Sequence, residues 1–286
     1  MRRSFTLIEI IFVLIILGIL ASIGSEIIVK VYENYLLTRS VSSSSYKLDV
    51  ALLQISKRLS NRIKNTEVTR DDTDALATLS ITGGTQFNHI EWIGRAYEVR
   101  RGEWNGSYNA PGYSGYTDFE DTNKTELSSP GSNLGVAQNI IKSLYGLDFN
   151  ESNNGTALIF YNAFTTNPLM AFGWGGLAPT SVYTVYKKDN KTFNFDNDDN
   201  KTVSDIYNLA CTAYALRHTD DDKLLLYYDY RPWDGDIYTN GNNIVLIDNV
   251  TTFKIRKLDR ALEIRICAED NTTGTPVEFC GKKVIF

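Results

Sequence analysis

A long apolar segment near the start of the chain limits the possible folds more than any other feature. Residues 10–23 contain no charged side chain. The 20 residues from position 5 to position 24 would span about 30 Å as an α-helix, which matches the hydrocarbon thickness of a bilayer. Arg2 and Arg3 precede the segment, so the positive-inside rule predicts a cytoplasmic N-terminus, with everything after about residue 25 on the other side.

Two simpler explanations of this segment remain open. Small residues at positions 21–25 could form the cleavage site of an ordinary signal peptide, although such peptides have a shorter apolar region. A plain, uncleaved signal anchor is the second explanation. Neither explains Glu9, because a carboxylate inserted at the centre of a membrane helix costs roughly 2.5–3.5 kcal/mol, and less near its end. A carboxylate in this position predicts a functional role and a cationic partner.

Residues 4–9, with the sequence SFTLIE, closely resemble the prepilin motif of type IV pilins and type II secretion pseudopilins. The resemblance implies that a prepilin peptidase cleaves between Ser4 and Phe5, methylates the new amine of Phe5 and leaves the apolar helix on the mature protein. It also implies that Glu9 neutralises the amine of a neighbouring subunit. Opposite charges in a low-dielectric filament core should pair and so select the register of assembly.

Ser4 departs from the pattern of that family, which strongly prefers glycine immediately before the cleaved bond. Small residues can be accepted there, so we expect cleavage that is slower than in a typical member. If Ser4 blocked cleavage, the chain would remain an uncleaved, membrane-anchored envelope protein.

The helical pattern continues beyond the membrane segment. Apolar residues recur at spacings of three and four, which define one face of a helix that normally packs on its own domain. These residues are Leu48, Leu52, Ile55 and Leu59. The first proline is Pro111, so nothing forces a break, although the serine-rich residues 40–45 predict a looser or bent stretch. A single helix over residues 5–63 would be roughly 90 Å long, with half of it protruding.

From about residue 75 the chain consists of strand-like segments separated by connections rich in Gly, Asn and Asp. The pattern predicts an α+β fold, in which a long membrane-spanning and stalk helix precedes a β-rich globular domain with an antiparallel sheet. We expect strands at residues 76–81, 90–100, 157–161, 181–186, 207–216, 224–230, 244–257, 262–268 and 277–286, and a helix at 136–145. The expected boundaries are a leader at 1–4, a membrane helix at 5–25, a stalk at 26–65 and the globular domain at 75–286.

The order of elements in the last third of the chain resembles the larger minor pseudopilins of the J type and related minor pilins. A hairpin around residues 219–223 is followed by the segments 247–255 and 261–266. The resemblance implies a structural subunit that initiates or caps a filament. Its partners would be other pilins or pseudopilins in a helical filament or tip complex, the prepilin peptidase and the bacterial inner membrane. The globular domain would lie in the periplasm and later in the pilus or pseudopilus.

Charge and motif content argue against several other functions. The net charge is −5 and the basic residues are scattered, so we predict no nucleic-acid contact. His89 and His218 lie in unrelated contexts, and the chain has no phosphate-binding loop or Gly-x-Ser-x-Gly motif, so we predict no enzyme. A tip-displayed adhesin or binding module remains the main alternative, and a membrane-tethered envelope enzyme is a third possibility.

The cysteines predict one disulfide. Cys267 and Cys280 fall on the last two expected strands, where they could face each other across a hairpin in an oxidising compartment. Two buried free thiols are the alternative. Cys211 should pack as a small apolar residue.

Five asparagines combine Ser or Thr two positions later with an acidic residue two positions earlier. Composition alone would give roughly half a site by chance. The pattern resembles the extended sequon of bacterial N-glycosylation systems, and the alternative is that loops rich in Asn, Asp and Thr generate it readily. The candidate sites are Asn105, Asn123, Asn150, Asn200 and Asn271.

Residues 196–200 superficially resemble the start of a calcium-binding loop, with Asp196, Asp198 and Asn200 as possible ligands. An EF-hand would need glycine at Lys201 and glutamate at Tyr207, which argues against this loop type. A looser calcium site is the alternative to a solvated turn, and we predict no cofactor.

Overall fold

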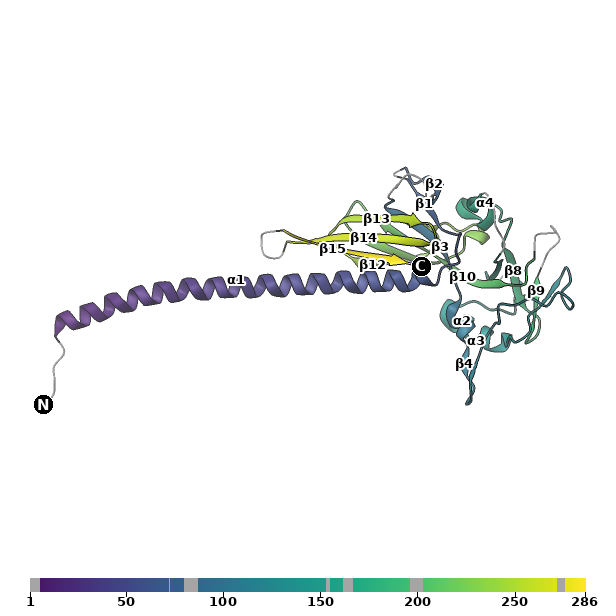
Figure 1. Ribbon diagram of the computed structural model, residues 1–286, viewed down its shortest axis with the longest axis horizontal. Helices are drawn as coiled ribbons and strands as arrows, with labels where there is room; N and C mark the ends of the chain where they lie inside the picture. Colours follow the sequence, from purple (N-terminus) through teal and green to yellow (C-terminus); the bar gives the residue numbers. More distant parts are fainter. Residues whose placement is uncertain are drawn as a thin grey trace.

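One very long helix dominates the computed structural model, which describes residues 6–71, 73–79, 87–152, 155–161, 167–195, 203–271 and 276–286. The helix α1 (Leu7–Ser60) has 54 residues and is therefore about 80 Å long. Its N-terminal part extends far from the folded region (Figure 1). The serine-rich stretch does not interrupt it, because the hydroxyls of Ser40 and Ser44 donate hydrogen bonds of 2.6 and 2.5 Å to the carboxylate of Asp270 in the folded region.

In the part of the chain that the structure describes, the strands form three separate sheets in which every pairing is antiparallel, so the predicted α+β class is confirmed. The ten-stranded sheet contains β1 (Val68–Arg70), β2 (Leu76–Thr78), β3 (His89–Arg95), β6 (Glu126–Ser128), β7 (Ala157–Phe160), β8 (Tyr183–Lys187), β9 (Thr192–Phe195), β10 (Tyr207–His218), β11 (Leu224–Tyr230) and β12 (Asn242–Ile247). The three-stranded sheet contains β13 (Val250–Leu258), β14 (Ala261–Asp270) and β15 (Val277–Ile285). A short ribbon pairs β4 (Glu103–Trp104) with β5 (Asn109–Ala110).

Strand β10 is the centre of the larger sheet. It pairs with β3 along one edge, and along its other edge with β7 near its start and with β11 near its end. The chain between β3 and β10, residues 97–206, therefore forms an insertion, which we call the distal lobe. The lobe contains α2 (Tyr97–Arg101), α3 (Leu134–Tyr145) and α4 (Pro168–Phe172). Figure 1 shows most of it beyond the end of α1, at the end of the molecule opposite to the N-terminus.

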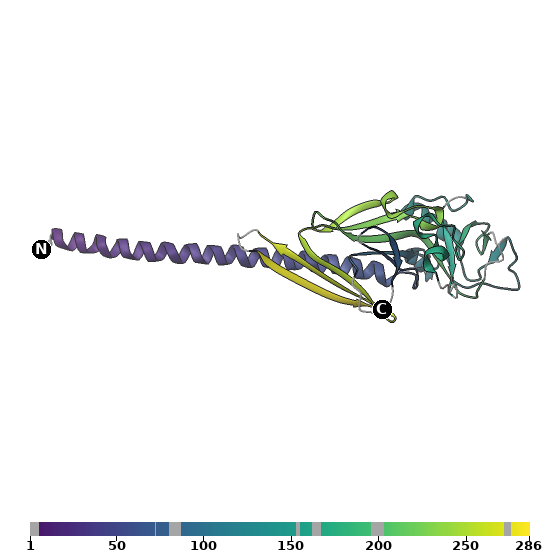
Figure 2. The same cartoon turned by 90° about the horizontal axis from the view of Figure 1, so that it is seen from above.

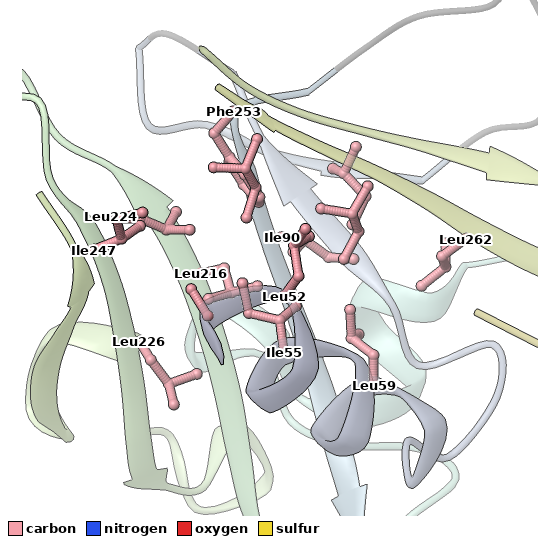
Figure 3. Close-up of a cluster of buried hydrophobic side chains, with 14 of the residues drawn as sticks. Leu52, Ile55, Leu59, Ile90, Leu216, Leu224, Leu226, Ile247, Phe253 and Leu262 are labelled. Carbon is pink, nitrogen blue, oxygen red and sulfur yellow. The ribbon is translucent and has the colours of Figure 1, made fainter. Parts of the chain in front are cut away.

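The last part of α1 lies between the two larger sheets. In Figure 2 the yellow strands of the three-stranded sheet and the green strands of the ten-stranded sheet flank the helix on opposite sides. The face predicted from spacing is buried there, and Figure 3 shows Leu52, Ile55 and Leu59 against side chains from both sheets. Strand β15 approaches closely, since a Cβ at Gly281 would clash with Cδ1 of Leu52. Each fully buried large apolar side chain contributes roughly 1.5–3 kcal/mol.

A buried ion pair fixes the C-terminal end of α1 to the sheets. Nε of Arg62 lies 2.5 Å from Oε1 of Glu67, and the two side chains are only 3% and 2% exposed. Nη1 of Arg62 also donates to the backbone carbonyl of Leu59 at 2.8 Å, in the last turn of the helix. Nζ of Lys257, on β13, is 3.8 Å from Oε2 of Glu67. These contacts join the helix end to β1 and to the three-stranded sheet.

The predicted disulfide is confirmed. Cys267 and Cys280 are directly opposite in the register of β14 and β15, with Cα atoms 4.1 Å apart, and they form a disulfide. The two cysteines are 13 positions apart in the sequence. A cross-link that closes a loop of this length stabilises a fold by about 3 kcal/mol. Cys211 is free and buried, as expected for an apolar core residue, and burial raises the pKa of its thiol to about 12.

Two of the expected strands, 90–100 and 244–257, are not single strands in the structure. The segment predicted as a strand over residues 90–100 leaves the sheet after Arg95, and residues 97–101 form α2 because Val99 is buried in the core of the distal lobe. The segment 244–257 is two strands in different sheets. They are divided at Asn249, whose φ of 56° is a left-handed conformation that asparagine tolerates.

The sheet also begins earlier than the expected boundary at residue 75, because β1 starts at Val68. The expected helix is present as α3. The side chain of Asn133 accepts a hydrogen bond from Val136 N at its start, and Gly146 adopts a left-handed conformation after its end.

Candidate assembly site on the N-terminal helix

Most of α1 has no cover from the rest of the molecule. It is long and apolar enough to cross a membrane, and the apolar window that meets this criterion is completely unburied. Among the described residues it is the one helix with this property. The predicted cleavage residues, Ser4 and Phe5, lie outside the described residues.

Glu9 lies in the first turn of α1, where its carboxylate caps its own helix. The backbone N–H and the hydroxyl of Thr6 each donate a hydrogen bond of 2.9 Å to Oε2 of Glu9. This position at the helix N-terminus also suits a negative charge, because the helix dipole is positive there. Within the described part of the chain Glu9 forms no ion pair.

An apolar stripe continues along α1 beyond the length that a membrane would cover. Its four members lie 7, 11 and 7 residues apart, which at about 3.6 residues per turn places them on one face of the helix. We call this face the outer stripe. Its members and their exposed fractions are Ile28 (70%), Tyr35 (59%), Tyr46 (71%) and Leu53 (60%).

The outer stripe lies roughly opposite the buried face of α1 that contains Leu52 and Ile55. Tyr46 and Leu53 are therefore beside the folded domain and yet point away from it. Large exposed side chains that recur on one face of a helix make this face a candidate interaction surface. The spacing of the stripe could have been found in the sequence. That it is exposed follows only once the packing of the other face is known.

The histidines take part in structural contacts. His89 is buried, and its Nε2 is 3.6 Å from Oε1 of Glu91, which also accepts a hydrogen bond of 2.6 Å from Arg70. Tyr230 donates to the other oxygen of Glu91 at 2.9 Å. Burial alone would raise the pKa of Glu91, but hydrogen bonds and charge from His89 and Arg70 hold it below its ordinary value. His89 and Glu91 are two positions apart on one strand, so the sequence could have indicated that their side chains share a face of the sheet.

The predicted calcium ligands Asp196, Asp198 and Asn200 lie outside the described residues. Elsewhere in the described parts, one group has ligand atoms close enough to hold a metal: Cys267, Glu278 and Cys280. The two sulfurs of this group are bonded to each other. Since the thiolate is the form of cysteine that binds metals, this group does not form a metal site.

Four of the five sequon asparagines lie on the surface of the described structure. Asn105, Asn123 and Asn150 are exposed in loops and turns of the distal lobe, and Asn271 is exposed at the end of the β14–β15 hairpin. Asn200 lies outside the described residues. A groove of about 630 Å³ in the distal lobe is lined in part by Thr125 and Ser152, the hydroxyl residues of two of these sequons.

Comparison with protein-family models, with curated proteins and with solved structures gave no match to this chain. The family resemblance of residues 4–9 therefore remains a prediction from the sequence.

Proposed function

We propose that the chain is a minor pilin or pseudopilin, a structural subunit that initiates or caps a type IV pilus or a type II secretion pseudopilus. In this proposal a prepilin peptidase cleaves before Phe5, and α1 moves from the inner membrane into the core of a helical filament. The N-terminus begins in the cytoplasm and the globular domain in the periplasm. Partners are other subunits of the filament or tip complex, and the proposal assigns no catalytic reaction to the chain.

The outer stripe is the observation that carries this proposal. A simple membrane anchor needs apolar residues only over the thickness of the bilayer, whereas the stripe reaches Leu53, beside the folded domain. Burying each of its large side chains against neighbouring helices would contribute roughly 1.5–3 kcal/mol. A bundle of parallel α1 helices from adjacent subunits would cover the membrane segment and the stripe together.

The position of the distal lobe supports a place at the end of a filament. The lobe lies beyond the C-terminal end of α1 (Figure 1). In a filament of parallel subunits, the folded domain of the next subunit away from the membrane would lie in this region. A subunit at the tip has no such neighbour, so an insertion of this size is accommodated there without a clash.

Leu53→Lys tests the role of the outer stripe. The side chain of Leu53 is mostly exposed, so the variant should fold and enter the membrane like the wild type. We expect at least tenfold less of it in sheared filaments, because a buried charge would face the neighbouring helix, and tenfold corresponds to about 1.4 kcal/mol. Immunoblots of the filament and membrane fractions measure how much of the variant is incorporated and how much enters the membrane.

The matched control is Glu33→Lys, which also introduces a lysine at an exposed position of α1 but lies away from the stripe. It should be incorporated within about twofold of the wild type. Equal incorporation of Leu53→Lys and the wild type would mean that the stripe is not an assembly surface.

A further inference from the structure

Acidic residues precede the N-glycosylation sequons of this chain far more often than composition predicts. The sequence has eight Asn-x-Ser/Thr sites, and five of them carry Asp or Glu two positions before the asparagine. Acidic residues make up 34 of 286 positions. If they were placed at random, about one of the eight sites would carry an acidic residue two positions before its asparagine. The three sites without the acidic residue are Asn154, Asn190 and Asn249.

Two of the acidic sites in the distal lobe have the same local structure. Oδ1 of Asn105 accepts hydrogen bonds of 3.0 Å from the N–H groups of Ser107 and Tyr108. Oδ1 of Asn123 accepts from the N–H of Thr125 at 2.9 Å and from its hydroxyl at 3.0 Å. In both turns the side-chain oxygen is held by the backbone. The amide nitrogen Nδ2, the atom to which a glycan is attached, has no hydrogen bond to any other described residue.

Asn150 is held by the acidic residue of its own sequon. Oδ1 of Asp148 accepts hydrogen bonds from the backbone N–H of Asn150 at 3.2 Å and from its Nδ2 at 3.1 Å. Ser152 of this sequon and Thr125 of the Asn123 sequon both line the open groove of the distal lobe. The hydroxyl residues of these two sequons therefore border one open groove, which has room for a bulky group.

We propose that Asn105, Asn123 and Asn150 are N-glycan acceptors for a transferase that recognises the acidic residue two positions earlier. The donor is an oligosaccharide carried on a membrane lipid through a pyrophosphate. A bond forms between Nδ2 and the anomeric carbon of the sugar, and the bond from that carbon to the pyrophosphate oxygen breaks. The lipid pyrophosphate is the leaving group, and in the net reaction it takes up the proton that Nδ2 loses. The membrane-length segment of α1 would keep the distal lobe on a chain anchored in the same bilayer as the donor.

The mass of the full chain purified from its native host tests this inference. We expect a mass above that of the polypeptide, with glycopeptides at all three asparagines. Asp121→Asn should remove the glycan at Asn123 while the acceptor and Thr125 stay in place. This variant separates recognition of the acid from damage to the turn, because Asp121 is exposed and Asn123 keeps its own hydrogen bonds.

The matched control is Asn190→Gln. Asn190 belongs to an exposed Asn-Lys-Thr site in a turn of the distal lobe, but Lys188 occupies the position two residues earlier. This variant should have the same glycan mass as the wild type. An unmodified polypeptide mass would overturn the inference, and so would a glycan at Asn190 or an unchanged glycan in Asp121→Asn. Because the readout is mass alone, it is independent of whether the chain enters a filament.

Discussion

Glu9→Leu is expected to enter the membrane at least as well as the wild type and to be lost from filaments. Insertion becomes easier because an apolar side chain replaces a carboxylate in the apolar segment. In the proposed filament core, however, the carboxylate neutralises the amine of Phe5 in a neighbouring subunit. Removing one partner of a buried ion pair costs about 3–5 kcal/mol, so incorporation should fall by at least about a hundredfold.

Glu9→Gln separates this charge effect from helix capping. In the structure Glu9 also accepts two hydrogen bonds from Thr6, and glutamine can serve the same capping role without a charge. We expect Glu9→Gln to be excluded from filaments like Glu9→Leu, while both variants accumulate in the membrane fraction. Normal incorporation of Glu9→Gln would mean that Glu9 acts only as a helix cap and would refute the pairing with Phe5.

Arg62→Met is expected to lower the free energy of unfolding by about 3–5 kcal/mol. The variant leaves Glu67 buried without the cation that lies 2.5 Å from it, and Lys257 at 3.8 Å compensates only in part. It also removes the hydrogen bond to the carbonyl of Leu59 in the last turn of α1. Urea unfolding of the full chain in detergent, followed by tryptophan fluorescence, measures this change. The variant should have a lower urea midpoint, whereas the slope of the unfolding free energy against urea concentration should stay the same.

Lys188→Met is the control for this experiment. Lys188 also forms an ion pair, with Glu126, but both side chains are substantially exposed. Solvent screens such a pair, so its removal should change the free energy of unfolding by less than about 1 kcal/mol. Comparable effects of the two variants would contradict the special role of the buried pair at the end of α1.

Helix α1 could be predicted from the sequence because apolar residues recur at helical spacing over many residues. The spacing of Leu48, Leu52, Ile55 and Leu59 identified the buried face of α1. The β-sheets were predicted less well. Strands such as β1, β6 and β9 have only three or four residues, too few for an alternating pattern to be distinct. The turn at Asn249 also lies inside one continuous β-like segment, so the change of sheet has no strong local signal.

The candidate assembly site was predicted only in part. Residue types around Glu9 suggested its role, whereas its hydrogen bonds to Thr6 required the structure. The exposure of Tyr46 and Leu53 depends on which side of α1 the two sheets cover. The pairing of Arg62 with Glu67 likewise depends on how the chain turns after the helix ends. Each of these features arises from tertiary packing, which local sequence patterns do not specify.

The mass of the mature N-terminus, measured on chain recovered from sheared filaments, tests the central proposal most directly. A filament subunit processed as proposed begins at Phe5 and carries a methyl group on its terminal amine. The slower cleavage expected from Ser4 would leave precursor in the membrane fraction but not in the filaments. A chain that retains Met1 in filaments, or one that begins beyond residue 20, would contradict the proposal.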